Sequence, residues 1–300
     1  MTKNIKYSII EPAFFKLDGG AMYGIIPKPL WNKVHPADEH NRILLALRLL
    51  LIQGPERTVL VDTGIGDYHD EKFVHMFDIN SLHSPLEQAL AEIGLTKEDI
   101  TDLVISHLHF DHIGGLGIDN EKGEHIALLP HAKVHVHKKH FEYALNPSAR
   151  DTGSFHSHRF GPLLKSYEDK GQLFFYGGDQ GELFDLGQGN PLKFITSHGH
   201  TPWLLHPYTD EYLYITDLIP TSNHLHIPWV MGYDIEPVVT TKYKTKLLKF
   251  IKNNHLKVIY EHDPLYWGSE LADDEKGRIR AKRNFEREDK LSYPISSIQV

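Results

Sequence analysis

Four apolar segments of strand length end in a histidine or an aspartate, and this pattern limits the folds open to the chain more than any other feature. The segments are ITDLVISH (100–107), LKFITSHGHT (192–201), EYLYITDL (211–218) and LKVIYEHD (256–263). Short apolar runs of this kind are typical of buried strands. Because sites in layered α/β proteins lie at the carboxyl ends of strands, we expect an α/β protein whose polar side chains meet at one edge.

The densest part of the pattern is HLHFDH, which contains His107, His109, Asp111 and His112. His107 and His109 are two residues apart and can project to the same side of an extended segment, while Asp111 and His112 continue around a turn. Imidazole nitrogen and carboxylate oxygen are suitable ligands for zinc, iron, cobalt and manganese. Four such side chains within six positions could bind two ions.

A histidine-rich surface loop is the alternative, since the chain has 22 histidines. Two features favour a metal site: the cluster follows a buried strand, and Gly114 and Gly115 behind it permit tight backbone passage. The chain has no cysteine, so it can form neither a disulfide nor a thiolate metal site. Any metal must be held by nitrogen and oxygen.

The composition is that of a globular protein, with 40% hydrophobic and 24% charged residues among 300. We find no repeat, low-complexity segment or linker, and therefore expect one domain over residues 1–300. The formal net charge is −8, and the one basic cluster, Lys276 to Arg287, is interpreted as a solvated segment. Nucleic acid is therefore not an expected partner.

No apolar run near the N-terminus reaches the length of a signal-peptide core, and the apolar run ILLALRLLLI (43–52) is interrupted by Arg48. This run is also too short to span a bilayer. We expect a cytoplasmic protein without a membrane partner.

Local signals complete the expected architecture. ILLALRLLLI and TVLVDTG (58–64) read as adjacent strands joined by a turn at QGPER. SPLEQALAEIGL (84–95) predicts a helix with Ser84 as its cap, Glu87 completing a capping box, and Gly94 at its end. YKTKLLKFIKNN (243–254) has helical spacing. Together they predict a layered sandwich with helices outside.

The chain resembles the metallo-β-lactamase-fold hydrolases, whose HxHxDH motif is present as His107, His109, Asp111 and His112. The family's other landmarks follow in order across most of the chain: Asp62 in VDTG, His200 in SHGHTP, Asp217 in YITDL and His262 in YEHD. This resemblance implies an α/β fold arranged as an αββα four-layer sandwich.

The resemblance also implies a role for each of these residues. His107, His109 and His200 would bind one metal, Asp111, His112 and His262 would bind a second, and Asp217 would bridge them. Asp62 would orient a ligand by hydrogen bonding. The implied cofactors are two divalent ions, zinc first, with manganese, cobalt and iron as alternatives.

Among members of this family, the residues favour small-molecule hydrolases. The chain lacks the cysteine ligand of many β-lactamases of the fold, and it has His109 where flavodiiron relatives have glutamate. We expect a lactone or ester to be opened by a metal-bridging hydroxide, with Asp111 carrying a proton to the leaving group and Asp217 bridging the metals. The alternatives are a phosphotriesterase or arylesterase and, less favoured, a nucleic-acid processing hydrolase.

The segment LDGGAMYGIIPKPLW (17–31) resembles the pocket-lining segment of quorum-quenching N-acyl homoserine lactonases and of methyl-parathion-hydrolase-like enzymes. It implies that Met22, Tyr23 and Trp31 contact substrate, although they could equally fill a core. His224, in the loop after Asp217, is a further pocket candidate. The expected partner is a small-molecule lactone or ester, and because relatives are often dimers a homodimer is one expectation.

Two departures from the family pattern bear on this expectation. Trp203 stands where relatives commonly have glycine after GHTP, and Leu218, Ile219 and Pro220 follow Asp217 where well-known lactonases have a nearby tyrosine. The remaining histidine groups, KVHVHKKHFEYAL (133–145) and SFHSHRF (154–160), are interpreted as a strand entering a helix and as a mobile loop.

Overall fold

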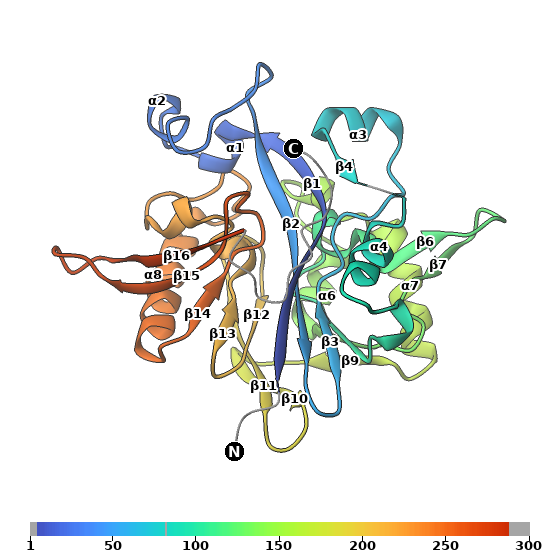
Figure 1. Ribbon diagram of the computed structural model, residues 1–300. Coiled ribbons are helices and arrows are strands. Elements are labelled where there is room, and N and C mark those ends of the chain that lie inside the picture. The colour runs from blue at the N-terminus through green and yellow to red at the C-terminus, as the bar shows by residue number, and fades with distance from the viewer. Residues whose placement is uncertain (1–4, 82, 288–300) are drawn as a thin grey trace.

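Two seven-stranded sheets form the centre of the molecule, as the computed structural model, which describes residues 5–81 and 83–287, shows (Figure 1). The first sheet is antiparallel from β4 to β3 and parallel from β3 to β9. Its order is β4 (Asn80–Ser81), β1 (Lys6–Asp18), β2 (Arg42–Gln53), β3 (Thr58–Val61), β5 (Asp102–Val104), β8 (Lys133–His137) and β9 (Leu173–Tyr176).

The second sheet is antiparallel except where β13 and β14 run parallel. Its order is β10 (Gln180–Asp185), β11 (Pro191–Ser197), β12 (Leu204–Tyr208), β13 (Tyr212–Tyr214), β14 (Lys257–Ile259), β15 (Tyr266–Asp273) and β16 (Ile279–Glu286). A small third sheet pairs β6 (Gly117–Asp119) with β7 (His125–Ala127).

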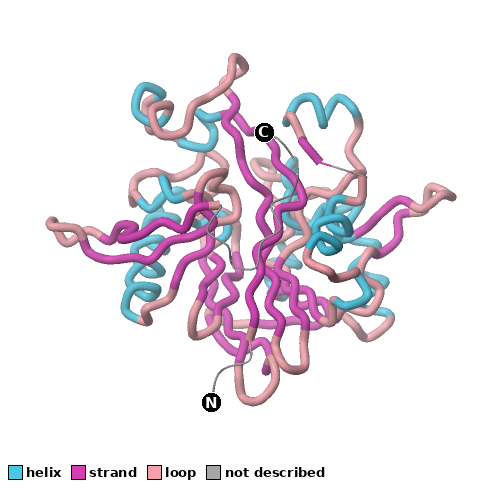
Figure 2. Tube along the Cα trace, in the orientation of Figure 1, coloured by secondary structure: helices cyan, strands magenta, loops and turns pink. Residues whose placement is uncertain are grey.

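The longer helices lie on the outer faces of the two sheets (Figures 1 and 2). The first sheet is covered by α4 (Pro85–Glu92), α6 (Lys138–Leu145) and α7 (Ser157–Asp169), and the second by α8 (Pro237–Asn253). Short helices lie beside the HLHFDH motif or at the edge of the molecule that is uppermost in Figure 1. They are α1 (Gly19–Tyr23), α2 (Lys28–Trp31), α3 (Glu71–Phe77) and α5 (Phe110–Ile113). In the described part of the chain, 3₁₀ turns lie at Lys97–Asp99, Gly114–Leu116, Thr152–Ser154, Thr216–Leu218 and Ser222–Leu225.

Three apolar clusters account for the layering. Side chains from the inner faces of both sheets pack together, including Leu50, Val104 and Phe194. A second cluster joins the outer face of the first sheet to α4, α6 and α7, and a third joins the second sheet to α8. β2 contributes Leu49 and Leu51 to one cluster and Leu50 to another, so it is buried on both faces. The predicted αββα four-layer sandwich is confirmed.

Several local predictions are confirmed. The turn after β2 closes with Gly54 N–H donating to the carbonyl of Arg57, and α8 covers the predicted helix 243–254. Gly114 also serves as expected, since a Cβ there would lie 2.0 Å from the carbonyl oxygen of Ile65. The expectation of one domain over residues 1–300 stays a prediction.

Two local predictions are wrong. Ser84 does precede α4, but it has a left-handed backbone and makes no side-chain cap; its N–H instead donates to Asp67. The stretch around His156 is not a loose loop either, since α7 begins at Ser157 and the Nδ1 of His156 lies 2.8 Å from the hydroxyl of Tyr68. Both residues are fixed by contacts with distant parts of the chain that a local pattern does not reveal.

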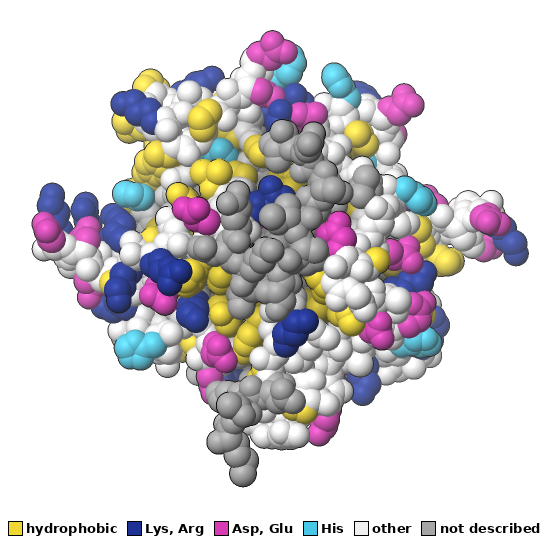
Figure 3. All heavy atoms as spheres, viewed as in Figure 1, with side chains coloured by type: hydrophobic (Ala, Val, Ile, Leu, Met, Phe, Trp, Pro, Cys, Tyr) yellow, Lys and Arg dark blue, Asp and Glu magenta, His cyan; other side chains and the backbone are white. Residues whose placement is uncertain are grey.

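The basic cluster from Lys276 to Arg287 includes part of the β15–β16 turn and all of β16, where Lys and Arg side chains gather on one side of the molecule (Figure 3). No helix in the described part of the chain is long and apolar enough to cross a membrane.

Candidate metal centre

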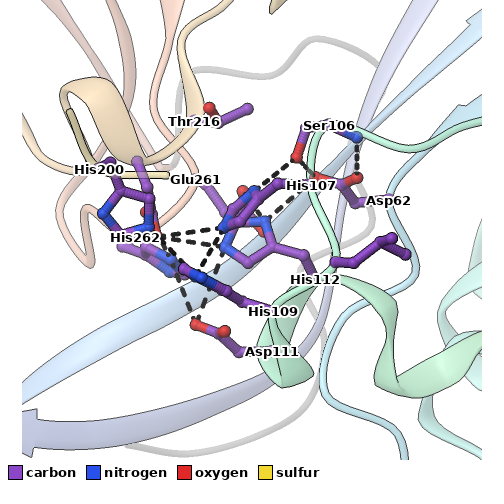
Figure 4. A network of polar contacts seen from close by, with 12 residues as sticks. Asp62, Ser106, His107, His109, Asp111, His112, His200, Thr216, Glu261 and His262 are labelled. Atoms are coloured by element: carbon purple, nitrogen blue, oxygen red, sulfur yellow. Dashed lines mark hydrogen bonds and ion pairs between the residues drawn. The ribbon is translucent and has the colours of Figure 1, made fainter. Parts of the chain in front are cut away.

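Seven buried histidine and aspartate side chains meet where the strands of both sheets end (Figure 4). The first sheet contributes His107 after β5 and the residues of α5, whereas the second contributes loops after β11, β13 and β14. The seven are those that the sequence singled out: His107, His109, Asp111, His112, His200, Asp217 and His262.

The first group consists of three imidazoles and one carboxylate oxygen. The Nδ1 of His109 lies 3.0 Å from the Nε2 of His107 and 3.2 Å from the Nε2 of His200. The Oδ2 of Asp217 lies 3.1 Å from the Nε2 of His200. Four ligand atoms from loops of both sheets thus surround one point.

The second group lies beside the first and shares Asp217 with it. The Nε2 of His262 lies 3.1 Å from the Oδ1 of Asp217 and 3.6 Å from the Oδ2 of Asp111. The Nε2 of His112 lies 3.8 Å from that same Asp111 oxygen. Since the other oxygen of Asp217 faces the first group, this carboxylate lies between the two.

The spacing within both groups fits a metal ion. Ligand atoms about 2.0–2.2 Å from a tetrahedral ion lie roughly 3.3–3.6 Å apart, which is close to the separations seen here. Among the described residues, His112 Nε2 and Asp217 Oδ1 are buried without a hydrogen-bond partner, which is costly unless a cation satisfies them. This His/Asp cluster is therefore suited to binding metal ions.

The electrostatics of the metal-free cluster agree with a cation site. Burial alone would lower the pKa of His200 and of His262, but the neighbouring Asp217 outweighs it and raises the pKa of each to about 9. Burial would raise the pKa of Asp217, yet the surrounding histidines hold that pKa well below its usual value. Positive charge is thus favoured beside Asp217, and a bound cation would displace the histidine protons.

Asp62 lies where the resemblance implied, behind the ligand motif. Its carboxylate accepts hydrogen bonds from the N–H and the hydroxyl of Ser106, at 2.7 and 2.5 Å. The Nδ1 of His112 lies 3.2 Å from the same carboxylate, and that of His107 lies 3.1 Å from the Ser106 hydroxyl (Figure 4). Asp62 therefore orients His112 directly and His107 through Ser106.

Glu261 is a second buried carboxylate behind the same histidine, and the sequence analysis did not identify it. Its Oε2 lies 3.0 Å from the Nδ1 of His112, whereas the Oδ2 of Asp62 lies 3.2 Å from the same nitrogen. Burial raises the pKa of Glu261 to about 7 although His112 draws it down. The sequence signal that could have identified Glu261 is its position as an acidic residue next to His262 at the end of a buried strand.

Asp234 lies behind His200 in the same way and orients its ring, and it too was not predicted from the sequence. Its Oδ1 lies 3.1 Å from the Nδ1 of His200, and the carboxylate is almost fully buried. The loop that carries Asp234 is held by Lys244 of α8, whose ammonium donates to the carbonyls of His226 and Trp229.

His262 is held by the backbone of β2. Its Nδ1 donates to the carbonyl of Ala46 at 2.8 Å, and Ala46 N–H donates back to the carbonyl of His262. Arg48, two residues further along β2, donates to the carbonyls of Tyr260 and Asp263, which flank the ligand loop.

The pocket residues suggested by the resemblance are buried in this structure. Tyr23 is stacked between Trp31 and His224, with ring centroids 5.4 and 4.8 Å away. His224 also bonds through both nitrogens, to the hydroxyl of Thr221 and the carbonyl of Met22. These contacts favour the alternative that Met22, Tyr23 and Trp31 fill a core, and a substrate contact stays a prediction.

Other aromatic side chains lie beside the ligand motif. Phe110, between His109 and Asp111 in the chain, is stacked with His156 and contacts Phe73 of α3 edge to face. Phe77 packs against both Phe73 and Phe110. These partly buried rings give the region next to the ligands an apolar character.

Comparison with known proteins agrees with the site. Residues 49–262 match the model of the metallo-beta-lactamase superfamily. N-acyl homoserine lactonase AttM of Agrobacterium fabrum is 25% identical over 183 residues, which are 59% of this chain and 63% of that protein. The chain thus matches less than two thirds of the length of this relative.

Solved structures share the fold. A probable metal-dependent hydrolase from Staphylococcus aureus superposes with a TM-score of 0.81 at 26% identity, over 96% of this chain and 99% of that one. AidC, a dizinc quorum-quenching lactonase solved with an N-acyl-L-homoserine product, gives a TM-score of 0.69 at 21% identity, over 93% and 94%. Since the family model covers more than half of the chain, this protein belongs to the metallo-beta-lactamase superfamily.

Proposed function

We propose that this protein is a hydrolase with two divalent metal ions that opens a lactone or ester of a small molecule. The observation that carries the proposal is the pair of adjacent ligand groups with Asp217 between them, its Oδ2 3.1 Å from His200 and its Oδ1 3.1 Å from His262. Two cations about 3.5–4 Å apart are the arrangement of many hydrolytic metal sites.

In this proposal each group holds one ion. His107, His109 and His200 bind the first and Asp111, His112 and His262 bind the second, with Asp217 bridging them. Zinc is the first choice because imidazole and carboxylate are its common ligands, although manganese, cobalt and iron accept the same set. AidC, which has the same fold, contains two zinc ions.

The ions would supply Lewis acidity, which activates water and polarises a carbonyl group. The chain's own contribution is to position the ligands and to manage protons. Asp111 is buried at the edge of the second group, and its carboxylate can carry a proton to the leaving alkoxide when the ester bond breaks. The apolar rings of Phe73, Phe77 and Phe110 nearby suit the acyl part of such a substrate.

A lactone is favoured as the substrate class because AttM is an N-acyl homoserine lactonase and AidC binds an N-acyl-L-homoserine product. A phosphotriesterase or arylesterase on the same ligands is the main alternative. Leu218, Ile219 and Pro220 after Asp217 leave the chain without the tyrosine that well-known lactonases have there.

The test is a pH-stat assay of the metal-loaded enzyme on short- and long-chain N-acyl homoserine lactones and on paraoxon. A higher kcat/KM for a lactone supports the proposal, whereas faster paraoxon hydrolysis identifies a phosphotriesterase. No hydrolysis of any ester or lactone by fully loaded enzyme would contradict it.

The variant Asp217→Asn should lose activity and part of its metal while the fold remains, because one bridging oxygen becomes an amide nitrogen. Asp273→Asn is the matched control, since Asp273 is a partly exposed carboxylate paired with Lys252 far from the ligands. Full turnover in Asp217→Asn would refute the assignment of Asp217.

A further inference from the structure

The first turn of α6 contacts two metal-ligand loops, although none of its residues belongs to either ligand group. His140 is fully buried there, and both of its ring nitrogens are hydrogen-bonded. Its Nε2 accepts from the N–H of Leu108 at 2.9 Å, and its Nδ1 donates to the carbonyl of Pro202 at 2.8 Å. Only a neutral imidazole with its proton on Nδ1 satisfies both partners.

The two partners of His140 lie in loops from different sheets. Leu108 stands between the ligands His107 and His109, after β5 of the first sheet, whereas Pro202 follows the ligand His200, after β11 of the second. One side chain therefore ties together the loops that supply three of the four ligand atoms of the first group.

His140 is not itself a candidate ligand. Its Nε2 lone pair is used by the Leu108 N–H, and its Nδ1 proton is directed at the Pro202 carbonyl. Burial also lowers the pKa of His140 to about 4, so the ring is neutral at pH 7, as these two hydrogen bonds require.

Trp203 provides a second, independent contact between the same loop and α6. Its backbone is left-handed, with φ +61°, a conformation that is strained for a non-glycine residue. Its ring is stacked on His137, with centroids 4.9 Å apart and planes at 3°, and Lys139 Nζ lies 4.4 Å from the ring centroid. These contacts help to offset the strain of a tryptophan at a position where relatives commonly have glycine.

We propose that His140 is a positioning residue that holds His107 and His109 at the distance from His200 which one metal ion requires, with Trp203 holding the His200 loop against α6. The proposal rests on the metal centre proposed above. Its physical basis is that metal–ligand distances tolerate only about 0.2 Å of error, so loops from two sheets must be fixed to each other.

The test compares metal loss from four variants loaded with Zn²⁺, three at His140 and His135 and one at Trp203. His140→Leu removes both hydrogen bonds, whereas His140→Gln can still accept through Oε1 and donate through Nε2. His135→Leu is the matched control: His135 is buried in β8, and both nitrogens of its ring are bonded outside the ligand loops, to Tyr176 and Asp102.

After mixing with excess chromogenic chelator, His140→Leu should lose one of its two ions about tenfold or more faster than wild type, as for other residues that orient ligands. His140→Gln and His135→Leu should lose metal at close to the wild-type rate, even where thermal stability falls. Trp203→Ala should also lose one ion faster than wild type. If His140→Leu does not fold, this variant still tests whether the attachment of the His200 loop to α6 retains the metal.

Three results would overturn the proposal. These are wild-type metal loss from a folded His140→Leu, equal acceleration in His135→Leu, or wild-type loss from Trp203→Ala when His140→Leu is unfolded. Because the assay measures metal and not turnover, a wild-type protein that holds two ions but opens no lactone contradicts the proposed substrate class alone. A wild type that holds no ion overturns both proposals.

Discussion

Four of the five candidate ligand histidines share one arrangement: a second ring nitrogen lies beside a group that fixes the ring, whereas the Nε2 of His109 is buried without a hydrogen-bond partner. His200 is paired with Asp234, His262 with the carbonyl of Ala46, and His112 with two carboxylates. The seven candidate ligands could be predicted from the sequence because each follows a strand-like run. Asp234 could not, because it lies 34 residues from His200 and no local pattern links them.

Replacing Asp234 by asparagine should weaken metal binding about 10- to 100-fold while leaving the fold intact, since His200 loses its charged acceptor. Competition with a chelator of known affinity gives the dissociation constant. Asp273→Asn serves again as the control. An unchanged affinity in Asp234→Asn would show that Asp234 does not orient a metal ligand.

Among the helices and strands, those strands that lead into the site are shorter than the apolar runs from which they were predicted. β13 and β14 each have three residues, because the chain leaves the sheet near Ile215 and Tyr260 to direct Asp217 and His262 into the site. α8 was predicted from its apolar spacing, but its most consequential side chain is polar. Lys244 is fully buried and donates to two carbonyls of the loop that ends at Asp234.

Burial lowers the pKa of Lys244 to about 7 in the folded protein, below the usual lysine value. Between about pH 7 and pH 10 the unfolded chain therefore holds a proton that the folded chain releases, so this residue makes stability rise with pH there. The free energy of unfolding of wild type relative to Lys244→Met should increase by up to about 1.4 kcal/mol per pH unit. Urea unfolding of both proteins at pH 7 and 9.5 measures this difference in the free energy of unfolding. The same pH dependence in wild type and Lys244→Met would contradict the lowered pKa of Lys244.

Across the whole molecule, the site lies where the two sheets meet, and the buried side chain of Arg48 connects them. Arg48 of the first sheet pairs with Glu11 at 2.6 Å and donates to the carbonyls of Tyr260 and Asp263, next to the second sheet. The sequence analysis noted Arg48 only as an interruption of an apolar run. The carbonyls that accept from Arg48 lie more than 200 residues away in the chain, so its role could not be assigned before the fold was known.

Arg48→Met should lower the free energy of unfolding by about 3–5 kcal/mol, because Glu11 loses a buried partner and two carbonyls lose a donor. Urea denaturation measures the loss. Glu11→Gln combined with Arg48→Met should recover part of it, since Glu11, which still pairs with Arg287 at 2.7 Å, then no longer carries a buried charge. A single variant as stable as wild type would show that Arg48 does not join the sheets.

In the proposed function, activity depends on two ions held by two groups that share Asp217. The most direct test is to titrate metal-free enzyme with Zn²⁺ while measuring N-acyl homoserine lactone opening. We predict that the rate rises with added metal and reaches its maximum at about two equivalents per chain. A full rate without metal, or a maximum at one equivalent, would contradict a dinuclear centre.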